Sequence, residues 1–167
     1  GGKTWTNDAP AIKDVGKITV AFELTRADAS KLKGSTTLEI TPRDVTVAPA
    51  PASKTYGDQD PDFTYEVKAG SLVQGEKLAG ITYTREAGEN VLTGYKTYKV
   101  TASQAKDANL NYNVEFEPGE FTIRRRTVEV EWAVAHYVYN GKEQGPTAKI
   151  TNLVNGDDVS LKLKDNA

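Results

Sequence analysis

The chain of 167 residues is 38% hydrophobic, enough for one large or two small folded domains. Its 21 basic and 23 acidic residues are mixed along the whole length and give a net charge of -2, which excludes a basic surface for nucleic acid or for a membrane. The absence of cysteine excludes disulfide bonds and thiol chemistry, and no apolar run approaches the roughly 18 residues of a membrane-spanning helix.

Alternating apolar and polar residues predict strands along most of the chain. In chain order, the alternating runs are 18–24, 45–47, 63–67, 81–83, 98–102, 112–116, 121–123 and 128–132. Each run turns apolar side chains to a core and Thr, Lys or Glu to solvent. Only residues 27–32 and 69–78 are candidates for a helical turn.

Turn residues separate these runs. The sequence Glu-Pro-Gly-Glu at 117–120 predicts a hairpin turn, in which proline sets φ and glycine supplies a positive φ. Ala-Gly at 87–88, Asn-Gly at 140–141 and Asn-Gly at 155–156 predict similar turns. We therefore expect an all-β fold, or a β-dominated fold with one short helix, built from small antiparallel modules. An immunoglobulin-like sandwich is the first expectation, and a β-grasp-like sheet is the alternative.

The sequence also repeats itself. Residues 38–47 align without a gap on residues 121–130, an offset of 83 that also places Tyr56 on Tyr139. Residues 72–76 align on 153–157 at an offset of 81, and residues 16–20 on 94–98 at an offset of 78. Three landmarks in one order at nearly constant spacing indicate about two periods of a tandem repeat.

The phase of the repeat sets the expected domains. With junctions after Arg43 and after Arg126, residues 44–126 are one complete repeat, 1–43 the C-terminal half of a preceding repeat, and 127–167 the N-terminal half of a following one. Alternatively, two modules divide near residue 83. The chain lacks methionine and starts at Gly1, so we expect a fragment of a longer protein. On the first phase, its truncated ends would associate head to tail with another copy.

A set of motif residues, most of them glycines and tyrosines, then indicates a resemblance to a known family. These motif residues are Tyr56, Gly57, Asp58, Pro61, Gly75, Gly88, Gly94, Tyr139 and Gly141. Residues 54–123 closely resemble the MBG-type repeat of large bacterial surface proteins, which is marked by a Tyr-Gly motif. Residues 139–147 resemble the start of a related bacterial immunoglobulin-like repeat. The inserted Leu92 and Thr93 depart from the family pattern and should lengthen one loop.

The resemblance implies a non-enzymatic tandem repeat on the bacterial cell surface, outside the cell, that acts as a stalk or adhesin spacer. It implies no catalytic residues and no cofactor. Its partners would be the neighbouring repeats of the same protein. The alternative is a module that binds a host glycan or matrix protein, for which Trp5 and Tyr95 are the aromatic residues freest to face solvent.

Few residues offer other chemistry. Asp58, Asp60 and Asp62 alternate as in a calcium loop, but an EF-hand needs glycine at its sixth and glutamate at its twelfth position, and this segment has neither. We favour a turn in which these carboxylates cap local amides. His136 has no catalytic motif near it and is expected at an exposed strand edge.

Two further hypotheses concern cations. The basic run at 124–126 is interpreted as a solvated linker or as a partner for nearby acids. A lysine–asparagine isopeptide bond would need a buried lysine, an asparagine and an acid together.

Overall fold

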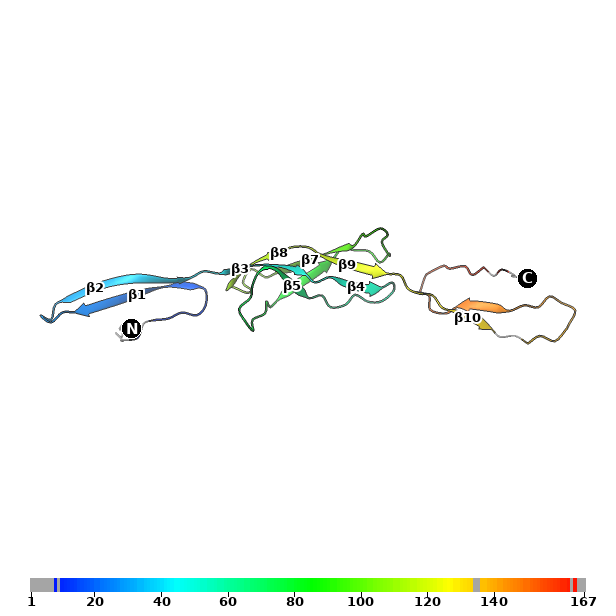
Figure 1. Ribbon diagram of the computed structural model, residues 1–167, viewed down its shortest axis with the longest axis horizontal. Coiled ribbons are helices and arrows are strands. Elements are labelled where there is room, and N and C mark those ends of the chain that lie inside the picture. The colour runs from blue at the N-terminus through cyan, green and yellow to red at the C-terminus, as the bar shows by residue number, and fades with distance from the viewer. Residues whose placement is uncertain (1–7, 9, 134–135, 163, 165–167) are drawn as a thin grey trace. The chain divides into compact units, whose positions relative to one another are not determined.

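The computed structural model describes residues 8, 10–133, 136–162 and 164 (Figure 1). The strands are β1 (Gly16–Thr25), β2 (Lys31–Ile40), β3 (Arg43–Pro49), β4 (Ala52–Thr55), β5 (Tyr65–Gly70), β6 (Ile81–Arg85), β7 (Tyr98–Gln104), β8 (Tyr112–Phe116), β9 (Gly119–Arg124), β10 (Val130–Ala133) and β11 (Thr147–Ile150). The fold is all-β, in several small and mostly antiparallel sheets, as the sequence predicts. Within the described residues no helix is present, and so none that could span a membrane.

Both expected helical turns are wrong. Residues 27–29 form the turn of the β1–β2 hairpin, where Arg26 accepts a hydrogen bond from the N–H of Ala29 and Ala29 has a positive φ of 61°. In the second segment, β5 continues to Gly70 and a tight turn follows at Gly75, whose φ is 86°. Turn hydrogen bonds and two tyrosine hydroxyls, which accept the N–H groups of Val73 and Leu78, satisfy much of the backbone there, so the weak helical propensity of these segments is overridden.

One compact unit comprises Gly1–Ala50, Phe63–Arg85 and Val100–Gly119. At its centre β3 pairs with β5 antiparallel and with β8 parallel, in the order β5-β3-β8. Val45, Val47 and Leu78 are buried here, and several half-buried side chains pack on them: Tyr65, Leu72, Ile81, Tyr112, Val114 and Phe116. This small core is the hydrophobic anchor of the unit.

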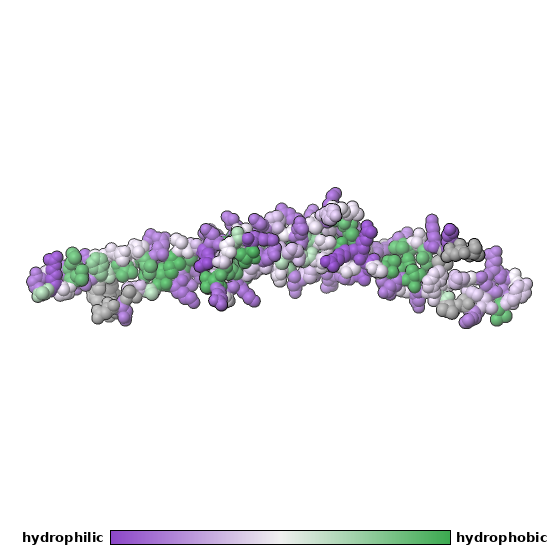
Figure 2. Space-filling model, in the orientation of Figure 1, coloured by the Kyte–Doolittle hydropathy of each residue, from purple (hydrophilic) through white to green (hydrophobic). Residues whose placement is uncertain are grey.

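The same unit contains the β1–β2 hairpin, which has two different faces. Phe22, Leu24 and Leu32 lie on one face and remain about half exposed, while Glu23 on the other face pairs with Lys31 and Lys33. Figure 2 shows hydrophobic surface along this hairpin. The alternation in β1 therefore gives the hairpin an apolar face that remains largely exposed.

The second compact unit comprises Pro51–Asp62, Glu86–Lys99 and Glu120–Ala167. Here β4 pairs with β9 in parallel, and β10 pairs with β11 antiparallel. Phe121 and Ile123 of β9 and Tyr98 at the start of β7 are buried. The apolar side of β9 therefore anchors this unit, because the alternation of the strand turns Phe121 and Ile123 to the same side.

Two parallel pairings share one register. Arg43 lies opposite Tyr112 and Ala52 opposite Phe121, so in both pairs each residue meets the one 69 positions later. The four-stranded sheet has the order β4-β9-β7-β6, and β6 pairs with β7 antiparallel. The chain therefore passes from the three-stranded to the four-stranded sheet after β3, after β5 and after β8.

This topology corrects the predicted hairpin at residues 117–120. β8 and β9 belong to different sheets, so they are not a hairpin. The N–H of Glu117 donates to the carbonyl of Val47 at 2.9 Å, and Pro118 then ends the pairing because it has no N–H. Gly119 is not in the positive-φ region. It is needed because a Cβ there would lie 2.4 Å from the carbonyl oxygen of Pro49.

Candidate functional site

Lys54 is a buried charged residue at the centre of β4, with 5% of its side chain exposed. Its ammonium group lies 2.7 Å from Oδ1 of Asp60 and also contacts the carboxylate of Glu89. Burial lowers the pKa of Lys54, but the hydrogen bonds to Asp60 and Glu89 outweigh it, so the net pKa is raised. The amine stays protonated and two carboxylates surround it, which is an ion-pair site and not the lysine–asparagine pair that the isopeptide hypothesis requires.

The end of β4 and the residues after it form a tight loop, which we call the Tyr-Gly loop (residues 55–58). The N–H of Tyr56 donates to the carbonyl of Arg124 at 2.8 Å, and the N–H of Asp58 donates to the carbonyl of Thr55 at 3.0 Å. Gly57 has a φ of 85°, a conformation that side-chain-bearing residues rarely adopt. The loop is thus fixed by backbone geometry.

Side chains of this loop contact a second loop, residues 152–157, which we call the acceptor loop. Tyr56 Oη donates to Oδ1 of Asp157 at 2.7 Å, and this hydrogen bond raises the pKa of Tyr56. A Cβ on Gly57 would lie 2.2 Å from Cγ2 of Val154, so the glycine also allows the two loops to touch. The Val154 carbonyl accepts the N–H of Asp157 at 3.0 Å, which shapes the acceptor loop as a turn.

Arg126 binds the Tyr-Gly loop at two points. Its Nε donates to the carbonyl of Tyr56 at 2.8 Å, and its guanidinium pairs with Asp58. Arg126 and Val154 also line a pocket of about 230 Å³ beside Tyr56. The basic run at 124–126 thus contributes one arginine to a specific ion pair, as the sequence suggested as one of two alternatives.

The calcium candidates are not brought together. Asp58 faces Arg126, Asp60 faces Lys54, and Asp62 is exposed. Among the residues that the structure describes, no group of three or more acidic or histidine side chains could hold a metal ion. The first two carboxylates serve as counter-ions to separate cations.

The other motif residues are dispersed. Pro61 is exposed, and Tyr139 is 92% exposed. Gly75, Gly94 and Gly141 have positive φ and open space around them, so their role is to turn the chain. Gly88 differs, because a Cβ there would lie 2.5 Å from the buried ring of Tyr98.

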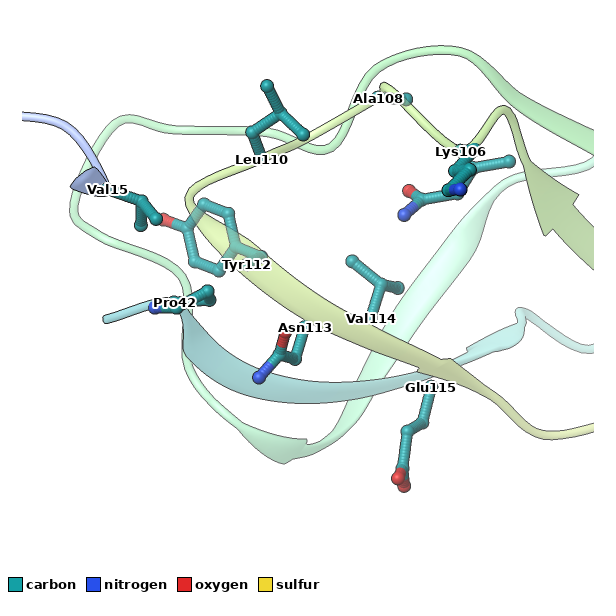
Figure 3. A pocket seen from close by; sticks show the side chains of 10 residues that line it. Val15, Pro42, Lys106, Ala108, Leu110, Tyr112, Asn113, Val114 and Glu115 are labelled. Carbon is teal, nitrogen blue, oxygen red and sulfur yellow. The ribbon is translucent and has the colours of Figure 1, made fainter. Parts of the chain in front are cut away.

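A pocket of about 580 Å³ lies beside β8 in the first unit. Figure 3 shows Tyr112 and Val114 on the pocket side of β8, with Leu110 of the preceding loop opposite, while Glu115 points away. These side chains include no nucleophile with an adjacent base, so the pocket does not have the constellation that acyl or glycosyl transfer needs. His136 is exposed and is not in a strand.

Two aromatic residues were candidates for ligand contact. Tyr95 is fully exposed and, like Gly94, has a positive φ. Trp5 lies outside the described residues.

Residues 45–122 match the family model of the MBG domain (YGX type). This segment of the chain is an MBG domain. MBG domains are a non-catalytic family typical of repeats in bacterial surface proteins. No match was found among curated proteins or among solved structures. The Tyr-Gly loop therefore carries the family signature at Tyr56 and Gly57, and the acceptor loop lies outside the matched segment.

The sequence did not reveal the partners of the signature. The alignment of residues 72–76 on 153–157 found the acceptor loop as a repeated element, but it did not connect that element to Tyr56. The repetition of this Leu-Val-x-Gly-acid pattern outside the alternating runs is the signal that could have pointed to an interface.

Proposed function

We propose that this chain is a non-enzymatic part of a tandem-repeat protein outside the bacterial cell, where MBG repeats act as a semi-rigid stalk or adhesin spacer. The observation that carries the proposal is the contact between the Tyr-Gly loop and the acceptor loop. The family signature there binds the polypeptide that follows the MBG domain, rather than a ligand or a metal. A family signature that binds the following segment of the chain is what a contact between adjacent repeats would require. In solenoid-like arrays each repeat contacts only its neighbours.

Two features support stiffness. β3 begins at Arg43, soon after β2 ends at Ile40, which leaves no room for a flexible linker. After β9, the connecting segment is held by Arg126, whose guanidinium reaches back to Asp58.

The proposal is tested by small-angle scattering on the full chain and on Arg126→Gln. We expect an elongated particle with a narrow range of dimensions for the parent chain and a broader range for Arg126→Gln, because the variant loses the ion pair and the hydrogen bond to Tyr56. Arg124→Gln removes the same charge from an exposed side chain that does not line the pocket beside Tyr56, and it is the matched control. A compact particle, or equal broadening by the two variants, would reject the semi-rigid stalk.

A second function is favoured by Tyr95. Its ring is fully exposed and its φ of 56° lies in the left-handed region, which costs a side-chain-bearing residue about 1–2 kcal/mol. Such strain is common at sites of recognition, and an exposed ring can stack on a sugar. Binding of the chain to a glycan or matrix-protein array that is lost in Tyr95→Ala, but kept in Tyr139→Ala, would favour this ligand-binding role.

A further inference from the structure

The chain contains a second set of residues like those that contact the Tyr-Gly loop. We call this set, Arg43, Val73 and Glu76, the second acceptor. At the repeat offsets of 83 and 81, Arg126, Val154 and Asp157 correspond to Arg43, Val73 and Glu76. The first three residues line the pocket of about 230 Å³ beside Tyr56. Their equivalents line a pocket of about 330 Å³ in the first unit. Both pockets thus have an arginine, a valine and a carboxylate at equivalent places.

Hydrogen bonds to neighbouring residues fix the side chains and backbone of the second acceptor. Tyr112 Oη donates to the carboxylate of Glu76 at 2.5 Å and accepts the N–H of Val73 at 2.9 Å. The side chain of Arg43 donates to Ser71 Oγ at 3.1 Å, and its N–H donates to the carbonyl of Asn111 at 3.0 Å. The residues that would receive a loop are therefore already positioned, which lowers the cost of binding one.

The valine of the second acceptor is accessible to solvent. Val73 is 46% exposed, whereas the equivalent Val154 packs against Gly57. The one Tyr-Gly pair in the sequence, Tyr56-Gly57, already lies against Val154.

We propose that Arg43, Val73 and Glu76 bind the Tyr-Gly-Asp loop of another repeat, as Arg126, Val154 and Asp157 bind residues 56–58. The tyrosine hydroxyl donates to Glu76, the glycine backbone lies against Val73, and the aspartate pairs with Arg43. This inference rests on the proposed function, because it makes the loop and acceptor the joint of a repeating array. To the proposed function it adds that the partner is the Tyr-Gly-Asp loop of another repeat, and it names the residues that bind this loop.

Disulfide capture tests the proposal on the full chain, which has no cysteine of its own. At the occupied joint, a Cβ on Gly57 would lie 3.3 Å from the Cβ of Val154. This is close to the separation of about 3.5–4.5 Å across a disulfide bond. The probe is a synthetic peptide with the sequence of residues 52–62 and cysteine in place of the glycine. It is equilibrated in glutathione buffer with the full-length Val73→Cys variant, and the mixed disulfide is measured by mass spectrometry.

The control is Val67→Cys, a similarly exposed valine on β5 that does not line the pocket. We expect several-fold more capture at position 73 than at position 67. Replacing the tyrosine of the peptide by phenylalanine, or Glu76 by alanine, should lower the excess roughly threefold to tenfold, the range for one net hydrogen bond. Circular dichroism of Glu76→Ala checks that the chain is still folded.

The outcomes are separable. Equal capture at both cysteines, or an excess that does not respond to the tyrosine hydroxyl, would overturn the second acceptor. Specific capture by a chain that scatters as a compact particle would keep the acceptor and reject the stalk. An elongated particle without specific capture would keep the stalk and reject the second acceptor.

Discussion

At the scale of single residues, two requirements for glycine at position 57, its backbone conformation and its contact with Val154, can be measured separately. Its φ of 85° is strained for any side chain, and a Cβ would also meet Val154. We expect Gly57→Ala to lower the free energy of unfolding by about 2–4 kcal/mol, from about 1–2 kcal/mol of backbone strain plus the clash. Urea denaturation measures the change.

The matched control is Gly94→Ala. Gly94 has a similar φ of 69° but no atom within 4 Å of the added methyl group. It should show the backbone cost alone, about 1–2 kcal/mol. Adding Val154→Ala to Gly57→Ala should recover part of the difference. Equal losses in Gly57→Ala and Gly94→Ala would mean that the two loops do not touch in solution.

At the scale of strands, the exchange between sheets after β8 depends on close packing at Gly119. Because its φ is not positive, a substitution there is penalised only by the contact with Pro49. We expect Gly119→Ala to destabilise the chain by about 1–3 kcal/mol, the usual cost of forcing extra volume into a packed site. Gly16→Ala, where the nearest atom is 3.9 Å away, should be neutral in the same denaturation experiment. A neutral Gly119→Ala would show that Gly119 and Pro49 are not closely packed in solution.

The strands also show what the sequence could and could not reveal. Alternation located β7, β8 and β9 because each turns its apolar side chains to the more buried face and its polar side chains to solvent. It missed β4, in which the alternating inward residue is Lys54, a charge that the pattern assigns to solvent. It also missed β11 and most of β2, where alternation is weak.

The pairing of the strands was harder to predict than their existence. A hairpin is read from its turn, but the parallel partners of β3 and β4 lie 69 positions away with no local signal. The same limit applies to the site. Glycine and tyrosine marked the Tyr-Gly loop, whereas Asp157 became visible as its partner only through a hydrogen bond across 101 positions.

At the scale of the whole molecule, alkaline pH should weaken the fold. Hydrogen bonds to Asp157 and to Glu76 raise the pKa of Tyr56 and of Tyr112 above the ordinary tyrosine value of about 10. A pKa that is raised in the folded state contributes stability below the unfolded value, and this contribution is lost as pH rises through the folded value. The free energy of unfolding should therefore fall above pH 10.

The double variant Tyr56→Phe, Tyr112→Phe isolates this effect from other groups that titrate there, including Lys54. It should be less stable than the parent near neutral pH and should lose less stability on going to alkaline pH. Chemical denaturation at a series of pH values gives both quantities. Parallel pH profiles for the two proteins would contradict the assignment of these hydroxyls as donors.

The last prediction concerns association between copies. β1–β2 and β10–β11 are two-stranded sheets, which are marginally stable unless something covers them. By the repeat alignment, β1–β2 corresponds to β7 and β9, which in the four-stranded sheet lie between β6 and β4. β10–β11 corresponds in the same way to β3 and β5. If the repeat phase with junctions after Arg43 and Arg126 is right, each hairpin has the strands of one half of a module, and the apolar face of β1–β2 would be covered by residues 127–167 of another copy. We expect concentration-dependent association in sedimentation velocity.

The cross-strand pair Leu24 and Leu32 decides whether this face is responsible. Changing both to lysine should abolish association, because the charges cannot be buried without partners. Changing the opposed residues Thr19 and Thr37 to lysine places the same charges on the opposite face of the hairpin and should leave association intact. If the parent chain stays monomeric at every concentration, the halves do not complement each other, and the repeat phase with junctions at Arg43 and Arg126 loses its main physical consequence.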